Sequence, residues 1–134
     1  MTIEWVIPAR LARSARPGFG SFSATEVSPA EVEAWLREAR SLGIRSVLCL
    51  LDERQLDYYR RLPGGLLEEY RQAGLAVASV PVPDLQVPPI SEADLNLVWR
   101  AFAELPSPLV IHCSAGIDRT GAAVDYILRR LGAP

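Results

Sequence analysis

The sequence predicts an α/β fold: a central, largely parallel sheet of about four or five strands, with helices on both faces. Three observations lead to this prediction. Short β-rich runs alternate with helical patterns along the 134 residues, and such alternation is typical of parallel sheets. The run "IRSVLCLL" at 44–51 is almost wholly apolar, as expected for a strand covered on both faces. The helical patterns between the runs carry recognisable start and stop signals.

In the first half of the chain, "IEWVIP" at 3–8 predicts a strand. A helix then follows, with Ser28 as its N-cap, Pro29 at its first position, Glu31 closing a capping box and Gly43 ending it. Its apolar residues recur at helical spacing and should share one buried face: Val32, Trp35, Leu36, Ala39 and Leu42. The apolar run at 44–51 is the next strand.

The second half continues the alternation. Residues 53–73 predict one or two helical pieces broken at "LPGG", with "YYRR" at 58–61 as a solvated face. Gly74 precedes a strand, "LAVASVPV", and a proline-rich loop at 81–89 leads to a helix capped by Ser91. The spacing places inward Val98, Ala101, Phe102 and Leu105, and makes Trp35, Trp99 and Phe102 core residues. "PLVIH" is the last strand and "TGAAVDYILRRLG" the last helix.

Length and composition exclude several classes of protein. Residues 1–134 have the length of a single domain that can bury a continuous core. The net charge of −2 supplies no global basic field, so neither nucleic acid nor an anionic membrane surface is expected as a partner. With no signal-peptide pattern and no long apolar stretch, we expect a soluble, cytoplasmic protein. Cys49 and Cys113 are too few for a disulfide framework.

The stretch "LVIHCSAGIDRTGAAV" at 109–124 carries the chemistry. It passes from a strand to a helix, and ligands of parallel sheets bind beyond the carboxyl ends of strands. Backbone amides of 114–119 would form a nest for an anion, reinforced by the helix dipole from Thr120 onward. Gly116 and Gly121 suit the close backbone approach that such a loop needs. The segment therefore predicts a phosphate-sized cradle.

Two side chains give this cradle a reaction. The guanidinium of Arg119 is a planar fork that can hold two phosphate oxygens at once. The positive surroundings should favour thiolate over thiol at Cys113. A thiolate at the floor of a phosphate cradle is a nucleophile for phosphorus.

The stretch "HCSAGIDRTG" at 112–121 resembles the signature of the protein tyrosine phosphatase superfamily, in its compact dual-specificity form. Upstream, "EWVIPARLA" is similar to the opening of these enzymes, "LLDER" to the segment after their central strand, and "VPVPDLQVPP" to their general-acid loop. The resemblance covers most of the chain. It implies a phosphatase that acts through a cysteinyl-phosphate and requires neither metal nor cofactor.

The resemblance also implies a role for each residue of the motif. Cys113 would be the nucleophile, and Arg119 would clamp the phosphate and the transition state. Thr120 would help the sulfur to leave, and His112 would hold the geometry of the cysteine. Asp84 would protonate the leaving oxygen and then deprotonate the attacking water. The phosphate would lie against the loop formed by Ser114, Ala115, Gly116, Ile117, Asp118 and Arg119.

Two departures from the family pattern leave alternatives open. Asp118 stands where this form often has glycine, so it is a rival to Asp84 as the acid, and Asp84 could be only a turn residue in a proline-rich loop. Only fifteen residues follow Arg119, whereas relatives usually continue with further helices. The short C-terminus suggests a minimal version or protection by self-association, and the oligomeric state stays open.

Three functions are compatible with the sequence. The leading one is a phosphatase of phosphotyrosine, with phosphoserine and phosphothreonine as further substrates; its partner would be a phosphorylated protein or a small phosphomonoester. The second acts on a phosphoinositide or an RNA 5′ end, but Ile117 and Asp118 occupy positions where relatives with such substrates carry basic residues. The third is a catalytically weak phosphate-binding module.

Cys49 has two readings of its own. It is either a buried strand residue or the partner of Cys113 in a regulatory disulfide, which some relatives of this family form from a similar strand.

Overall fold

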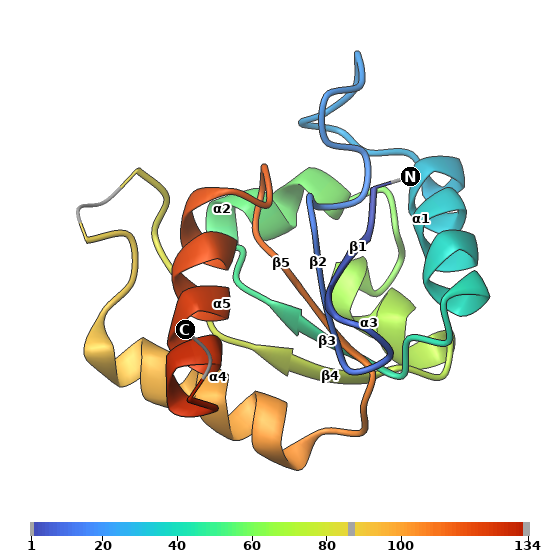
Figure 1. Ribbon diagram of the computed structural model, residues 1–134. Helices are drawn as coiled ribbons and strands as arrows, with labels where there is room; N and C mark the ends of the chain where they lie inside the picture. Colours follow the sequence, from blue (N-terminus) through green and yellow to red (C-terminus); the bar gives the residue numbers. More distant parts are fainter. Residues whose placement is uncertain (1, 86–87, 133–134) are drawn as a thin grey trace.

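The computed structural model describes residues 2–85 and 88–132, and its centre is a five-stranded sheet of order β1-β2-β5-β3-β4 (Figure 1). Four neighbouring strands, β2, β5, β3 and β4, are parallel, and the edge strand β1 pairs antiparallel with β2. This confirms the predicted α/β class and the largely parallel sheet. The strands are β1 (Glu4–Ile7), β2 (Leu11–Ser14), β3 (Ser46–Cys49), β4 (Ala76–Ser79) and β5 (Leu109–His112).

Helices cover both faces of the sheet, as predicted (Figure 1). On one face, α1 (Pro29–Ser41) and α3 (Gly65–Gln72) enclose one buried apolar cluster. On the other face, α4 (Glu92–Glu104) and α5 (Asp118–Arg130) enclose a second cluster. The shorter pieces α2 (Glu53–Leu56) and η1 (Asp57–Tyr59) follow β3. None of the helices in the described part of the chain is long and apolar enough to span a membrane.

The start and stop signals of α1 act as predicted. The Ser28 hydroxyl accepts from the Glu31 amide at 3.2 Å, and the Glu31 carboxylate accepts from the Ser28 amide at 3.3 Å. Gly43 has a φ of +74° just beyond the helix end, a conformation that favours glycine. Four of the five residues predicted for the inner face are buried, and Leu42 packs at its edge.

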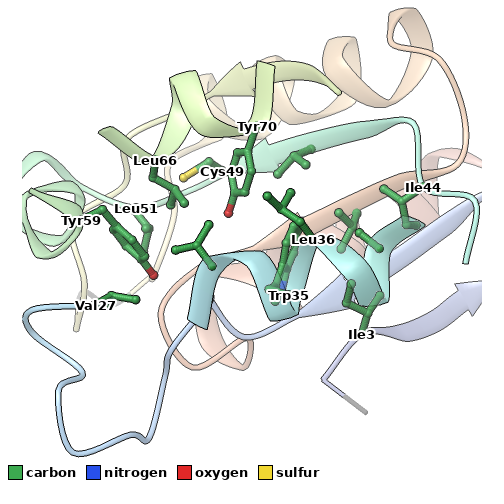
Figure 2. Close-up of a cluster of buried hydrophobic side chains, with 14 of the residues drawn as sticks. Ile3, Val27, Trp35, Leu36, Ile44, Cys49, Leu51, Tyr59, Leu66 and Tyr70 are labelled. Carbon is green, nitrogen blue, oxygen red and sulfur yellow. The ribbon is translucent and has the colours of Figure 1, made fainter. Parts of the chain in front are cut away.

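The cluster under α1 and α3 contains aromatic side chains that later bear on the site. Figure 2 shows Trp35, Tyr59, Tyr70 and Cys49 projecting into it together with Leu36. The rings of Trp35 and Tyr70 lie 5.4 Å apart between centroids. The cluster also contains Ala12, Cys49 and Val110, so it packs against β2, β3 and β5.

Several predictions about individual segments were wrong. The sequence reading missed β2, because "LARS" has little intrinsic β propensity; pairing with β5 makes it a strand. Tyr59 is fully buried rather than part of a solvated face, and its hydroxyl donates to the Pro17 carbonyl. Trp99 is only partly buried at the edge of the second cluster. Finally, α5 begins at Asp118, two residues earlier than predicted.

Candidate active site

The predicted phosphate loop connects the carboxyl end of β5 to the start of α5. Cys113 is the first residue after the strand, and it is only 2% exposed. Gly116 has a φ of +76°, and a Cβ there would lie 2.5 Å from the Ser14 carbonyl oxygen. Only glycine satisfies both conditions, so the close approach of the loop to β2 depends on this residue.

Arg119 projects from the first turn of α5 and is 1% exposed. One terminal nitrogen, Nη1, donates to the Leu50 carbonyl at 3.2 Å, to the Val82 carbonyl at 2.8 Å and to Gln55 Oε1 at 2.9 Å. In contrast, Nε has no hydrogen-bond partner among the described residues. The guanidinium is thus anchored through Nη1, and the edge formed by Nε and Nη2 is left for an anion.

The carboxylate of Asp84 occupies the Nη2 end of this edge of Arg119. Its Oδ2 is 3.3 Å from Arg119 Nη2 and accepts from Gln55 Nε2 at 3.0 Å, while Oδ1 accepts from the Leu85 amide at 3.0 Å. The side chain is 28% exposed, so it borders solvent as well as the buried guanidinium. The structure therefore brings Asp84 and Arg119 together at the mouth of the loop.

His112 is buried behind the loop, and its two partners define its tautomer. Its Nδ1 lies 3.1 Å from the Cys113 carbonyl oxygen, which can only accept, so Nδ1 carries the proton. Nε2 therefore accepts from the Tyr70 hydroxyl at 2.8 Å. Burial, together with the nearby charges of Arg16 and Arg119, lowers the pKa of His112 to about 4, against the opposing effect of the Cys113 carbonyl. The imidazole is consequently neutral at neutral pH.

A family model described as "polymorphic toxin system, DSP-PTPase phosphatase" matches residues 24–133. This chain belongs to the DSP-PTPase phosphatase family. The resemblance of the sequence is thereby confirmed, and with it the assignment to the cysteine-based phosphatases. A search of the curated proteins found no match.

Solved structures of other phosphatases share the fold of this family member. Tk-PTP in its active form is 21% identical, with a TM-score of 0.65 over 99% of this chain and 76% of that chain. The core catalytic domain of the PP-IP phosphatase SIW14 from S. cerevisiae is 18% identical, with a TM-score of 0.56 over 96% and 65% of the two chains. TpbA of P. aeruginosa, in complex with pTyr, is 17% identical, with a TM-score of 0.50 over 95% and 77%.

Asp118, the rival acid of this DSP-PTPase family member, is not among the hydrogen-bond or ion-pair partners of Arg119. It is exposed at the first position of α5, and it forms no hydrogen bond or ion pair with any residue in the described ranges. A carboxylate in the first turn of a helix is stabilised by the helix dipole. Thr120, two residues further along α5, is buried, and its hydroxyl has no hydrogen-bond partner in the described part of the chain.

Gln55 is a site residue that the sequence reading missed. It is buried in α2, where its Oε1 accepts from Arg119 and its Nε2 donates to Asp84. The helix itself begins with a capping box, since the Asp52 carboxylate accepts from the Gln55 amide at 2.9 Å. An Asp-x-x-Gln pattern directly after the buried strand was the available signal for a residue held at the strand end.

The two cysteines lie on opposite faces of the sheet. Cys49 belongs to the cluster under α1 and α3, whereas Cys113 belongs to the cluster under α4 and α5. Both thiols are free, and burial raises the pKa of the Cys49 thiol to about 12. The structure thus favours the buried-strand reading of Cys49 and contains no disulfide between the two.

A groove runs from the mouth of the loop along α5. Its first part has a volume of about 620 Å³ and is lined by Leu85, Pro89, Ile117, Asp118, Gly121, Ala122 and Asp125. A second pocket shares three of these residues and continues to Tyr126 and Arg129. The charged side chains that line the first part are both acidic. In the described residues, no group of three or more His, Cys, Asp or Glu side chains is placed to hold a metal ion.

Proposed function

We propose that this family member hydrolyses phosphomonoesters on protein side chains, with phosphotyrosine as its principal substrate, through a cysteinyl-phosphate. The observation that carries the proposal is the Nε and Nη2 edge of buried Arg119, at the helix start that follows Cys113: Nε has no partner among the described residues, and Nη2 pairs only with the part-exposed Asp84 carboxylate. A buried guanidinium anchored through one nitrogen, with its other edge available, is suited to bidentate binding of phosphate.

In the first step, the Cys113 thiolate attacks phosphorus, so that an S–P bond forms as the bond from phosphorus to the leaving oxygen breaks. Arg119 holds two equatorial phosphate oxygens and stabilises the charge that they carry in the transition state. Bound phosphate takes the place of the Asp84 carboxylate on Nη2. Once released from the guanidinium, the Asp84 carboxylate takes up a proton from solvent. Held at the mouth by Gln55, Asp84 then donates this proton to the leaving phenolate.

In the second step, water attacks phosphorus and the S–P bond breaks, which returns the electron pair to sulfur as thiolate. Asp84, now a carboxylate, accepts the proton of the attacking water. The Thr120 hydroxyl is a buried donor with no partner in the described part of the chain, and we assign it to the departing thiolate. Phosphate is the product, and Cys113 is again a thiolate. Asp84 releases its proton to solvent when phosphate leaves and the carboxylate pairs with Arg119 again.

The groove supports a protein substrate over a polyanion. A peptide on either side of a phosphorylated residue needs an extended surface next to the phosphate, and the groove provides one with an apolar floor. Asp118 and Asp125 line it with negative charge, which opposes a polyphosphorylated ligand and attracts a basic side chain. The shared fold leaves the choice open, since TpbA was solved with pTyr and SIW14 is named a PP-IP phosphatase.

The test of the chemistry is the pH dependence of aryl phosphate hydrolysis with a chelator present. Cys113→Ser should abolish turnover, and Asp84→Asn should lose about a hundredfold in kcat together with the alkaline limb of the profile. Asp118→Asn is the matched control, because it removes the neighbouring exposed carboxylate, and it should keep both. Loss of the alkaline limb in Asp118→Asn instead would move the acid to the loop. A wild type without turnover would make the chain a phosphate-binding module.

The test of the substrate class compares phosphotyrosine peptides that carry arginine or glutamate beside the phosphorylated residue. The arginine peptide should have about a tenfold higher kcat/KM, and Asp125→Asn should reduce that preference without changing aryl phosphate hydrolysis. Faster turnover of an inositol polyphosphate than of either peptide would contradict the proposal.

A further inference from the structure

Residues 13–16, at the end of β2, hold the phosphate loop from behind. Arg13 Nη2 donates to the Gly116 carbonyl at 2.9 Å and to the Ile117 carbonyl at 3.4 Å. The Arg16 amide donates to the Ser114 carbonyl at 2.9 Å. These contacts join segments about a hundred residues apart in sequence, and they involve the carbonyl groups of the loop.

Fixing these carbonyls also fixes the amides of the loop. In a planar trans peptide, a carbonyl and the following N–H point in opposite directions. Because the carbonyls of Ser114 and Gly116 point toward residues 13–16, the N–H groups of Ala115 and Ile117 are turned away from them. A loop that binds an anion needs its amides free on one side, and free amides that point the same way form a nest.

Arg16 brings a second buried positive charge to this region. It is 4% exposed; its Nε donates to the Ser114 hydroxyl at 3.1 Å, and its Nη1 donates to the Tyr59 hydroxyl at 3.3 Å. Its guanidinium carbon lies 4.9 Å from the centre of the Tyr58 ring. Within residues 2–85 and 88–132, it forms no salt bridge with a carboxylate.

A buried cation without an anionic partner is costly for the folded state. The cost is offset when an anion binds nearby, because the charge then acquires a partner in a medium of low dielectric. Arg16 donates a hydrogen bond to Ser114, the first residue after Cys113, so an anion bound in the loop would lie close enough to neutralise its charge. The structure thus contains two buried arginines at the loop, one on each side of it in sequence.

We infer that Arg13 and Arg16 are positioning residues that preset the phosphate loop, and that Arg16 also supplies a positive charge for the bound phosphate from behind the loop. This inference rests on the proposed function, since it treats 113–119 as a phosphate cradle. Neither residue touches the reacting atoms; both act through the carbonyls and the Ser114 hydroxyl. Their contribution should therefore appear in phosphate affinity more than in the chemical step.

The experiment measures binding of inorganic phosphate by titration calorimetry, together with KM and kcat for an aryl phosphate and the melting temperature. Arg16→Met should weaken phosphate binding and raise KM about tenfold, with a smaller change in kcat. Arg16→Lys should recover most of the affinity, because the charge remains. Arg13→Met removes the hydrogen bonds to two loop carbonyls together with a less buried positive charge, and it should weaken binding about threefold. Arg40→Met, at an exposed arginine of α1, is the control and should bind as wild type does.

Each outcome separates the inference from the proposed function. Wild-type affinity in Arg16→Met, or equal affinities in Arg16→Lys and Arg16→Met, would overturn the role of the charge. If Arg16→Met does not fold, Arg16→Lys and Arg13→Met decide. Unchanged phosphate affinity in Arg13→Met would overturn the positioning role of residues 13–16. An affinity loss in Arg16→Lys as large as that in Arg13→Met would overturn the role of the Arg16 charge. A wild type that binds no phosphate would reject the proposed function together with this inference.

Discussion

Gln55 is the residue that connects the two charged groups of the site. Replacing it by leucine removes one acceptor of buried Arg119 and the donor that holds Asp84. Gln55→Leu should lower kcat/KM about tenfold and reduce the free energy of unfolding by about 1–3 kcal/mol, because a buried charged group loses a partner. Steady-state kinetics and urea denaturation measure the two effects. Gln72→Leu, at an exposed glutamine of α3, should change neither.

His112 makes the stability of the fold depend on pH. Its folded-state pKa of about 4 lies below the ordinary value of 6.5, so the unfolded chain binds more protons between these values. The contribution of His112 to the free energy of unfolding is therefore fully present above pH 6.5, and it is lost as the pH falls toward 4. From pH 7 to pH 5 the loss due to this residue should be about 2 kcal/mol.

The histidine is the only one in the sequence, which gives a direct control. His112→Asn keeps a donor for the Cys113 carbonyl but does not titrate. Urea denaturation of this variant at pH 7 and pH 5 should show a difference smaller than that of wild type by about 2 kcal/mol. Equal differences in the two proteins would mean that the histidine is not neutral in the folded state.

At this scale, sequence reasoning found the residues whose chemistry is local. Cys113, Gly116 and Arg119 lie within one short segment with a specific spacing, so the motif predicts them. Gln55 and Arg16 reach the loop from 64 and 98 residues away along the chain. Their side chains have no chemistry that distinguishes them from other glutamines and arginines, and only the packing of β2 and α2 brings them to the site.

Among the elements, the phosphate loop depends most closely on a neighbouring strand. Gly116→Ala would place a methyl group 2.5 Å from the Ser14 carbonyl, at a positive φ that disfavours alanine. Gly43→Ala has a similar φ of +74° but open space around its Cβ. Both variants should lose about 1 kcal/mol through strain, and Gly116→Ala should lose a further 1–3 kcal/mol and most of its activity.

Thermal denaturation and aryl phosphate turnover distinguish the two contributions. If Gly116→Ala were no less stable than Gly43→Ala and fully active, the loop would be free to move away from β2. The positioning role of residues 13–16 would then lose its geometric basis.

Element boundaries show where local signals suffice. Helix α1 carries its own cap, proline and terminal glycine, so its limits could be predicted from residues 28–43 alone. Strand β2 carries none of these signals, because four residues of "LARS" become a strand only through hydrogen bonds to β5. Because β2 is the strand that leads into residues 13–16, the sequence pattern did not predict their contacts with the phosphate loop either.

For the molecule as a whole, the sheet divides the two thiols between separate cores. The side chain of Cys49 is fully buried, and this burial raises the pKa of its thiol to about 12. The native protein should therefore be alkylated by iodoacetamide at pH 8 only at Cys113, whereas both cysteines should react after unfolding. Mass spectrometry of native wild type and of Cys113→Ser counts the modified sites.

Inorganic phosphate supplies the internal control. It should slow the alkylation of Cys113 in the native protein and have no effect on alkylation of the unfolded protein. Modification of Cys49 in the native state would show that the core under α1 and α3 opens on the timescale of the reaction. Formation of a Cys49–Cys113 disulfide on mild oxidation would contradict the assignment of the two thiols to separate clusters.

The strand order places β2 directly against β5, although they lie near opposite ends of the sequence. During synthesis, residues 13–16 leave the ribosome long before the loop that they contact has been made. When residues 113–119 leave the ribosome, the segment 13–16 that they contact has already been synthesised. We therefore expect an incomplete nascent chain to lack an ordered phosphate loop, and we expect proteolytic removal of the first sixteen residues to abolish activity while leaving residues 112–121 intact.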